Sequence, residues 1–163
     1  MYITKKSNNK SLLLLNRKTK KLEVYELTDE KYMRSVIQLR EDFSPTKYSV
    51  YQKKFEMECL FGHDDSPTPH GLVDIIYKSK RDEEYISGYY PGYNKVKFYG
   101  YLTIFEDYFI HSDLYAGEAT TNTYMNLEPI STDDDGTSGC IRVSQEDLNW
   151  LLENVDIGTT VVL

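Results

Sequence analysis

Short apolar or alternating segments separated by polar turns make up most of the chain, a pattern typical of β-strands. Residues 12–15 and 22–27 are two such segments, and the polar residues 16–21 between them predict a hairpin. From residue 96 to residue 104 the even positions are apolar or glycine, and this period of two predicts one half-buried strand. Residues 106 and 107 then predict a turn, after which a further strand ends at His111.

One helix is well signalled over residues 144–155. Ser144 and Asp147 have the spacing of a capping box, in which a hydroxyl bonds to the backbone three residues later. The apolar positions that follow have the i, i+3, i+4, i+7 spacing of one buried helix face: Leu148, Leu151, Leu152 and Val155. Gly158 ends this pattern, and residues 160–163 predict a closing strand.

A second helix is expected over residues 29–39, where Tyr32, Val36 and Leu39 share one helical face. The segments that contain glycine or proline between the predicted elements are expected to be loops: residues 62–71, 87–94 and 131–139. We find no internal repeat. The sequence therefore predicts a single domain, residues 1–163, that is mostly β and forms a curved sheet or β-sandwich with one clear helix.

The net charge and the lack of long apolar segments argue against nucleic acid and the membrane interior as partners. The 163 residues carry 19 basic and 26 acidic side chains, a net charge of −7, so the chain lacks the positive surface that a nucleic-acid partner requires. No segment approaches the roughly 20 apolar residues that span a bilayer. The apolar residues 12–15 are too short for a secretory signal, so no signal peptide is visible and the route of export stays open. We expect a monomer without a membrane segment.

The two cysteines, Cys59 and Cys140, are too few for a disulfide framework. A catalytic cysteine needs a nearby base that raises its thiolate fraction. Cys140 follows Gly139 between a polar loop and the capped helix, where a thiol is accessible and backbone N–H groups can face an oxyanion. Cys59 lies in the apolar segment 55–61 and is expected to be a small buried residue.

The three histidines differ in their surroundings. His63 and His70 lie in turn-rich segments, whereas His111 closes an apolar strand. Their spacing supports no zinc site, and the acidic run 133–135 lacks the alternating ligands of a calcium loop, so we expect neither a metal nor a cofactor. From the residues alone, Cys140 and His111 fit either a nucleophile with its base or two structural side chains, and the choice stays open.

Residues 137–143, with the sequence TSGCIRV, resemble the C-terminal signature of the L,D-transpeptidase catalytic domain family. In that family a Ser/Thr-x-Gly-Cys-hydrophobic-Arg/Asn motif carries the nucleophile, and a Gly-Thr-x-Val strand like residues 158–161 follows it. Residues 109–112 resemble the family's histidine at a strand end. Residues 66–71, preceded by Gly62, resemble its Thr-Pro-x-Gly segment. The likeness extends, with gaps, from about residue 10 to residue 163.

The resemblance implies the mostly β catalytic fold of that family, with the catalytic half in residues 96–163. It also implies a reaction. Cys140 would attack a carbonyl in a peptidoglycan stem tetrapeptide, and His111 would take the thiol proton and deliver it to the departing D-amino acid. An amine of a second stem would then accept the acyl group and form a cross-link, or water would accept it, as in an L,D-carboxypeptidase. Ser112 would orient the imidazole.

The remaining motif residues are given supporting roles by the same resemblance. Backbone N–H groups around Ser138 and Gly139 would hold the oxyanion. Thr137 would contact the substrate, and Arg142 would either orient the substrate or serve as a structural cation near the site. The expected partners are peptidoglycan stem peptides, and the expected location is the cell envelope, outside the cytoplasm.

Two departures from the family pattern keep an alternative open. Ser138 stands where many members have a second histidine, and residues 113–136 form a longer stretch than usual, which predicts an enlarged lid over the cleft. The alternative is a catalytically impaired relative that binds the wall without turning over. A papain-like peptidase fits less well, because its histidine lies downstream of its cysteine.

Overall fold

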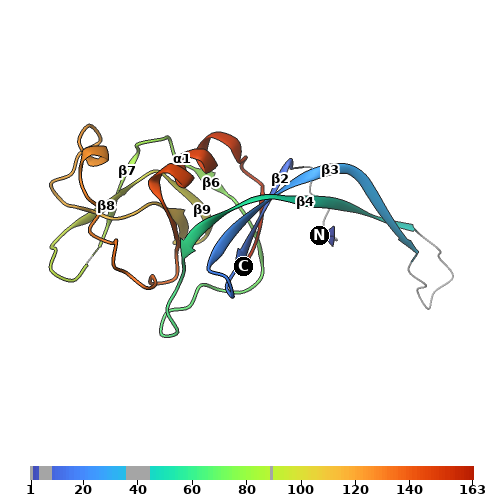
Figure 1. Ribbon diagram of the computed structural model, residues 1–163, viewed down its shortest axis with the longest axis horizontal. Helices are drawn as coiled ribbons and strands as arrows, with labels where there is room; N and C mark the ends of the chain where they lie inside the picture. The colour runs from blue at the N-terminus through green and yellow to red at the C-terminus, as the bar shows by residue number, and fades with distance from the viewer. Residues whose placement is uncertain (1, 4–8, 36–44, 89) are drawn as a thin grey trace.

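The computed structural model describes residues 2–3, 9–35, 45–88 and 90–163, and strands dominate it (Figure 1). The strands are β1 (Tyr2–Ile3), β2 (Ser11–Asn16), β3 (Lys21–Ser35), β4 (Pro45–Leu60), β5 (Leu72–Asp74), β6 (Tyr77–Lys78), β7 (Glu84–Ser87), β8 (Val96–Tyr99), β9 (Tyr101–Phe105), β10 (Tyr108–His111), β11 (Tyr115–Ala116), β12 (Ile141–Val143) and β13 (Thr160–Val162). The helices are the α-helix α1 (Gln145–Asn154) and the 3-10 helix η1 (Tyr124–Asn126).

Ten strands in the described part of the chain form one sheet, and three form a smaller one. The large sheet has the order β5-β13-β2-β3-β4-β12-β10-β9-β6, with β1 beside β4, and the small sheet has the order β11-β8-β7. Most neighbours are antiparallel, but β13 pairs with β2 and β10 pairs with β12 in parallel. The predicted fold class, mostly β with a curved sheet and one clear helix, is confirmed.

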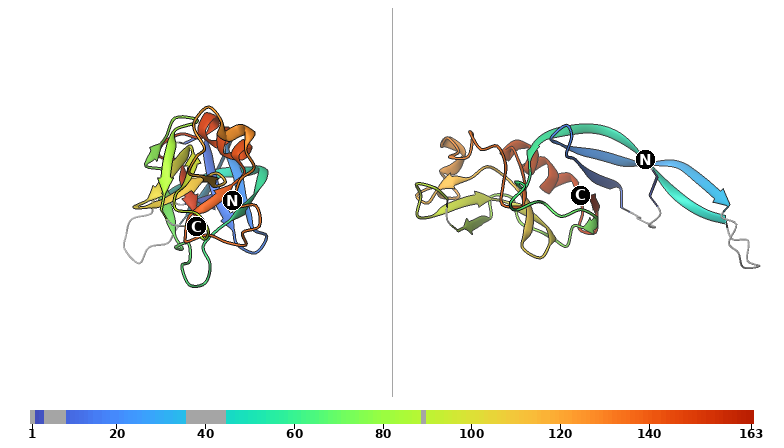
Figure 2. Two further views of the ribbon diagram at one scale, coloured as in Figure 1. Left: turned by 90° about the vertical axis from the view of Figure 1, so that its left-hand side faces the viewer. Right: turned by 90° about the horizontal axis from the view of Figure 1, so that it is seen from below.

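The opening hairpin is confirmed, and its second strand is much longer than the sequence predicts. On one side, residues 21–26 of β3 pair with β2. On its other side, β3 pairs with β4 from Lys21 to Ser35. The two long strands run past the rest of the chain as a ribbon (Figures 1 and 2). The helix expected over residues 29–39 is therefore wrong for residues 29–35, which are strand, while residues 36–39 lie outside the described residues. Pairing with β4 provides hydrogen-bond partners for the backbone of residues 31–35. The helical spacing of three apolar residues is a weaker influence than this pairing.

The single strand expected over residues 96–104 is divided in two at Gly100. β8 belongs to the small sheet, whereas β9 belongs to the large one. Gly100 has a φ of +81°, and a Cβ there would lie 2.7 Å from Leu152 Cδ1. The chain turns sharply where α1 packs against it, and only glycine fits this turn. Apolar alternation continues across the turn, so the period alone does not reveal the break.

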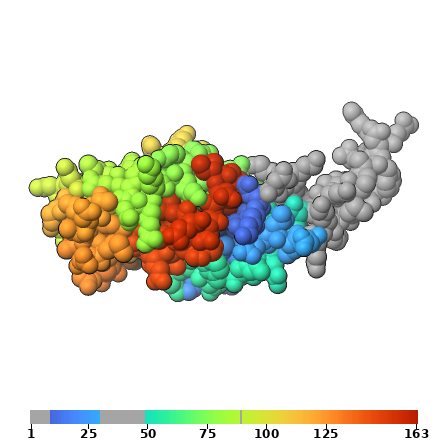
Figure 3. Space-filling view, turned by 90° about the horizontal axis from the view of Figure 1, so that it is seen from above, coloured from blue at the N-terminus to red at the C-terminus, as the bar shows by residue number. Residues whose placement is uncertain are grey.

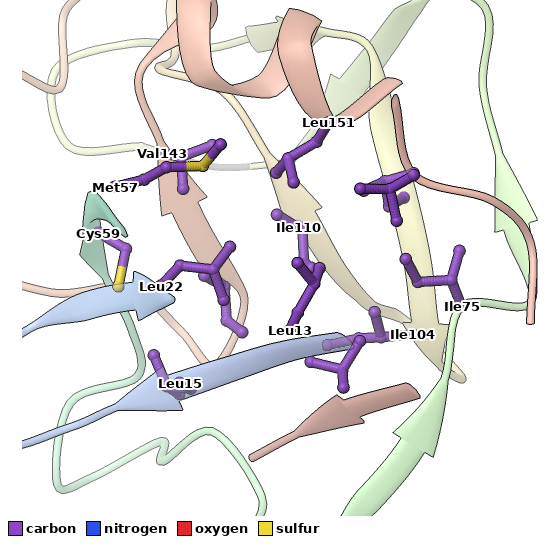
Figure 4. Close-up of a cluster of buried hydrophobic side chains, with 14 of the residues drawn as sticks. Leu13, Leu15, Leu22, Met57, Cys59, Ile75, Ile104, Ile110, Val143 and Leu151 are labelled. Carbon is purple, nitrogen blue, oxygen red and sulfur yellow. The ribbon is translucent and has the colours of Figure 1, made fainter. Parts of the chain in front are cut away.

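The largest buried cluster lies between the inner face of the large sheet and α1 (Figure 4). Side chains from distant segments meet there, among them Leu13 from β2, Ile110 from β10 and Leu151 from α1. Cys59 is part of this cluster and is 5% exposed, as the apolar surroundings in the sequence predict. Burial of this apolar surface is the main term that stabilises the fold.

Residues 113–136 form a structured segment with its own small core. Its two ends meet where Leu114 N donates to Ser131 Oγ at 2.9 Å and Ile130 N donates to Leu114 O at 2.8 Å. In its middle, the Tyr124 ring stacks on Tyr99 with centroids 4.0 Å apart. Figure 3 shows this orange segment at one end of the molecule, beside the red residues of α1.

The predicted helix α1 begins at the predicted cap. Ser144 is the N-cap residue, its Oγ accepts the Asp147 N–H at 3.1 Å, and the same hydroxyl donates to Asp147 Oδ2 at 2.8 Å. Leu148, Leu151 and Leu152 are buried on one face. Among the described residues no helix is long and apolar enough to cross a bilayer.

Replacing Ser144 by alanine removes the hydroxyl that accepts a free backbone N–H at the helix start. We expect Ser144→Ala to lower the free energy of unfolding by about 1 kcal/mol, measured by urea unfolding. Ser144→Asp, which places another good cap residue at this position, should stay within roughly 0.5 kcal/mol of the parent chain. Equal losses in both variants would mean that capping is not what Ser144 contributes.

Candidate active site

A cleft of about 560 Å³ opens beside the C-terminal end of β10 and the N-terminal end of β12. Both the loop before β12 and the loop between β7 and β8 contribute to its walls. Its lining consists of His63, Ser87, Tyr90, Pro91, Val96, His111, Leu114, Asp134, Gly136, Thr137, Ser138, Cys140 and Arg142. The histidine and the cysteine that the sequence singles out therefore face one common space.

Parallel pairing of β10 and β12 brings these two residues together. Ile110 is opposite Ile141 and His111 is opposite Arg142. Successive side chains on a strand alternate between the two faces of the sheet. Because Ile110 and Ile141 point into the buried cluster, the neighbouring His111 and Cys140 point to the other face, where the cleft lies.

The Cys140 thiol is half-buried and held by the backbone of the neighbouring hairpin. Phe109 N–H donates to its Sγ at 3.4 Å, and Sγ lies 3.9 Å from Asp107 O. Burial raises the pKa of the Cys140 thiol, while the Phe109 N–H and the charge of Arg142 partly oppose this rise. The resting residue is thus a neutral thiol that needs a base before it can attack.

The imidazole of His111 is held in one orientation by its neighbours. Its Nδ1 is 2.7 Å from Ser112 O. A carbonyl oxygen only accepts, so Nδ1 carries the proton and Nε2 of the neutral ring is left as the acceptor. The Phe98 ring stacks on the imidazole with centroids 4.3 Å apart. Burial, followed by the positive charge of Arg142, lowers the pKa of His111 to about 3, so the ring is neutral at rest.

Ser112 acts on the imidazole through its backbone and not through its hydroxyl. Its side chain is fully buried, and its Oγ donates to Asp113 O at 3.2 Å. The carbonyl of Ser112 fixes the ring of His111. The family resemblance implies that Ser112 orients the imidazole, and the group in contact with the ring is the backbone carbonyl. Any residue at position 112 would supply this carbonyl.

The loop before Cys140 has a backbone shape that requires glycine at position 139. Gly139 has a φ of +117°, and a Cβ there would lie 2.6 Å from Tyr108 Cε1. Thr137 Oγ1 accepts the Gly139 N–H at 3.2 Å and donates to Cys140 O at 2.6 Å. Ser138 is exposed and lines the cleft. Thr137 thus shapes the loop that presents the thiol, in addition to lining the cleft.

Arg142 is a buried cation that forms an ion pair with Asp134, a residue of the loop expected over residues 131–139. Its Nη1 lies 2.7 Å from Asp134 Oδ2, and the Tyr90 hydroxyl donates to Asp134 Oδ1 at 2.5 Å. The Arg142 Nε atom is buried without a hydrogen-bond partner. Tyr90 belongs to the loop between β7 and β8 and Asp134 to the loop before β12, so their bond joins two of the loops that line the cleft, next to Arg142.

Sequence reasoning missed three residues of this cleft: His63, Tyr90 and Asp134. His63 N–H donates to Thr137 O at 3.0 Å, and its ring is so close that a Cβ on Gly136 would meet it at 2.6 Å. A tyrosine in a glycine-containing loop and an aspartate within an acidic run give no periodic signal, so only the fold reveals these positions. Within the described residues no group of three or more His, Cys, Asp or Glu side chains forms a metal site.

The lowered pKa of His111 predicts a pH-dependent stability. An unfolded histidine takes up a proton near pH 6.5, whereas buried His111 does so only at about 3. The unfolded state therefore binds more protons between these values, and stability falls as the pH falls. From pH 7 to pH 5 we expect a loss of about 2 kcal/mol from this residue, measured by urea unfolding. His111→Gln should lack this part of the loss, and identical pH profiles for both chains would refute a buried neutral imidazole.

Solved structures of L,D-transpeptidases share this fold at low sequence identity. Matches over 94% of this chain have TM-scores of 0.57 to an L,D-transpeptidase from Mycobacterium smegmatis (15% identity) and 0.57 to L,D-transpeptidase 1 from Mycobacterium tuberculosis (12% identity). A third, from Enterococcus faecium, has a TM-score of 0.56 at 14% identity and the same coverage. The matches cover 58%, 60% and 49% of those three chains, so this chain spans about half to three-fifths of their length. No curated protein sequence matches this chain.

A family-level comparison covers most of the sequence. The L,D-transpeptidase catalytic domain family, YkuD, matches residues 44–163. The matched range contains β10, the loop before Cys140, β12 and every residue that lines the cleft. This chain therefore belongs to the L,D-transpeptidase catalytic domain family.

Proposed function

We propose that this protein is an L,D-transpeptidase that cross-links peptidoglycan by acyl transfer through Cys140. One observation carries the proposal: the neutral imidazole of His111, at the end of β10, and the thiol of Cys140, immediately before the parallel neighbour β12, line one cleft, with Nε2 of the imidazole left as an acceptor. Nucleophilic cysteine catalysis requires such a base, held in a fixed orientation. The expected partners are peptidoglycan stem peptides, and the reaction would take place on the cell-wall side of the membrane.

The first half-reaction would transfer an acyl group to the sulfur. As Cys140 Sγ attacks the carbonyl carbon that precedes the terminal D-residue, His111 Nε2 takes the thiol proton. Backbone N–H groups of the loop around Gly139 would stabilise the oxyanion. When the C–N bond breaks, the imidazolium returns the proton to the departing amine, leaving a thioester on Cys140 and a free D-amino acid.

The second half-reaction would reverse these roles. The side-chain amine of a second stem peptide attacks the thioester carbonyl, His111 takes a proton from that amine, and the C–S bond breaks to regenerate the thiol. The product is an amide cross-link between two stems. Water in place of the amine gives L,D-carboxypeptidase action, and the same residues serve both acceptors.

Arg142 would couple substrate binding to the strength of the base. Its positive charge is one cause of the low pKa of His111. The donor peptide ends in a carboxylate, and a carboxylate next to Arg142 would offset this charge and raise the pKa of the imidazole. The buried Arg142 Nε, which has no hydrogen-bond partner, is a donor suited to such a group.

Residues 113–136 would serve as part of a lid. Leu114, Asp134 and Gly136 line the cleft, and the bond from Tyr90 to Asp134 joins two of its loops. The first part of the segment is fastened to the small sheet, because β11 pairs with β8 and Lys97 Nζ donates to Ala119 O at 2.9 Å. Opening would therefore be confined to the residues around Asp134, where the bonds of Tyr90 to Asp134 and to Ile130 O and the ion pair of Asp134 with Arg142 would be exchanged for water.

A catalytically impaired relative remains the second candidate, favoured by Ser138 in place of the family's second histidine and by the raised pKa of the Cys140 thiol. Turnover of a disaccharide-tetrapeptide, with products read by mass spectrometry, separates the two candidates. The enzyme releases the terminal D-amino acid, whereas the impaired relative leaves the peptide intact.

Replacing the nucleophile should abolish turnover, because no thioester forms without Sγ. We expect Cys140→Ala and Cys140→Ser to lose D-amino acid release by at least about 10³-fold. Cys59→Ser is the matched control, since Cys59 is a buried core residue, and it should keep turnover within about fivefold while lowering stability. Activity that survives in Cys140→Ala would end the proposed mechanism.

A further inference from the structure

A short segment upstream of the cleft is joined to the loop that carries the nucleophile. Gly62 N–H donates to Thr68 Oγ1 at 2.9 Å, which closes the segment into a tight loop. A Cβ on Gly62 would lie 2.2 Å from Ser66 O and 2.4 Å from Thr68 N, so only glycine permits this closure. Thr137 N–H donates to Phe61 O at 2.9 Å, which fixes the two loops side by side.

Two hydroxyl groups of this segment hold two consecutive carbonyls just before the nucleophile. Ser66 Oγ donates to Ser138 O at 2.9 Å, and Thr68 Oγ1 donates to Gly139 O at 2.7 Å. Thr68 is fully buried, whereas Ser66 is exposed. The hydrogen bond from Thr68 is therefore shielded from solvent. Its acceptor, Gly139 O, belongs to the peptide unit that links Gly139 to Cys140.

The planarity of the peptide gives this contact a consequence for the site. In a trans peptide the C=O and the following N–H point in opposite directions. With Gly139 O directed at the buried Thr68 hydroxyl, the Cys140 N–H must point away from Thr68, to the side of the exposed loop surface. The Gly139 N–H already donates to Thr137 Oγ1, whereas the Cys140 N–H, on the reacting residue itself, is a donor that this loop can offer to an oxyanion.

We propose that Thr68 is a positioning residue for the acyl-transfer reaction, whose hydroxyl aims the Cys140 N–H at the oxyanion of the bound substrate. The inference rests on the proposed function. A hydroxyl that only filled space would be replaceable by a methyl group, but this one accepts from Gly62 and donates to Gly139 at the same time. Its β-branched side chain also restricts the rotamers that it can adopt.

The far side of the segment is anchored as a positioning element requires. Arg17 Nη2 donates to Thr68 O at 2.8 Å and to Pro69 O at 2.7 Å. The Arg17 guanidinium also lies over the Phe61 ring, 5.6 Å from its centroid. The backbone of Thr68 is therefore held from the β2–β3 turn while its side chain holds Gly139.

The test compares two reactions of the same thiol in Thr68→Val and Thr68→Ser. Acylation of Cys140 by the disaccharide-tetrapeptide develops an oxyanion, whereas alkylation by iodoacetamide does not. Removing an oxyanion donor costs about 10²–10³-fold, and misdirecting one should cost less, so we expect Thr68→Val to slow acylation by roughly 10–100-fold. The apparent KM should change by less than about threefold, because the loss appears only in the transition state.

The controls separate positioning from folding. Iodoacetamide should alkylate Cys140 in Thr68→Val within about twofold of the parent rate at each pH, since thiol access and pKa are unchanged. Thr68→Ser keeps the hydroxyl and should recover acylation to within about fivefold. If Thr68→Val does not fold, Thr68→Ala and Ser66→Ala still compare loss of the buried contact with loss of the exposed one, and the Cys140 amide resonance in NMR reports the orientation directly.

Each outcome decides the inference. Equal losses of acylation and alkylation, or acylation unchanged in Thr68→Val, would overturn a positioning role while leaving the proposed function intact. If Thr68→Val cannot be studied, an unshifted Cys140 amide resonance in Thr68→Ala, which lacks the hydroxyl, would overturn it equally. Failure of the parent chain to be acylated at all would instead overturn the proposed function, and this inference with it.

Discussion

The parallel pairing of β10 with β12 is the constraint on which the rest of the site depends. Ile110 and Ile141 sit opposite each other in the buried core, so their apolar contacts fix the register of the two strands. A slip of one strand by one residue would turn the side chains of that strand to the other face of the sheet and take its isoleucine out of the core. The energy that holds His111 and Cys140 on one face is therefore the hydrophobic energy of the core behind them.

On that scaffold the two groups that we propose to react are both neutral at rest. Burial and Arg142 lower the pKa of His111, and burial raises the pKa of the Cys140 thiol, so both shifts oppose an ion pair at rest. Of the charges nearby, Arg142 and Asp134 form an ion pair at 2.7 Å. A substrate carboxylate that competes for Arg142 would change this balance. Activation would then be a consequence of binding and not a property of the empty cleft.

The sequence predicts well what is local and periodic. Helix α1 begins at Ser144 because a cap and an apolar stripe coincide there, and β10 ends at His111 as its apolar run indicates. It predicts poorly what distant contacts decide. Gly100 breaks a regular alternation because Leu152 of α1 lies against it, and residues 29–35 are strand because β4 pairs with them. Asp134 and Tyr90 meet only through the fold, and no pattern in their loops shows it.

The central claim is that Cys140 carries the acyl group, and trapping the intermediate tests it most directly. The parent chain would be mixed with a disaccharide-tetrapeptide, quenched in acid within one turnover, and digested for peptide mapping by mass spectrometry. The account predicts a thioester of the stem tripeptide on the peptide that contains Cys140 and none on the peptide that contains Cys59. Release of the D-amino acid without any acyl group on Cys140, or an acyl group on another residue, would contradict it.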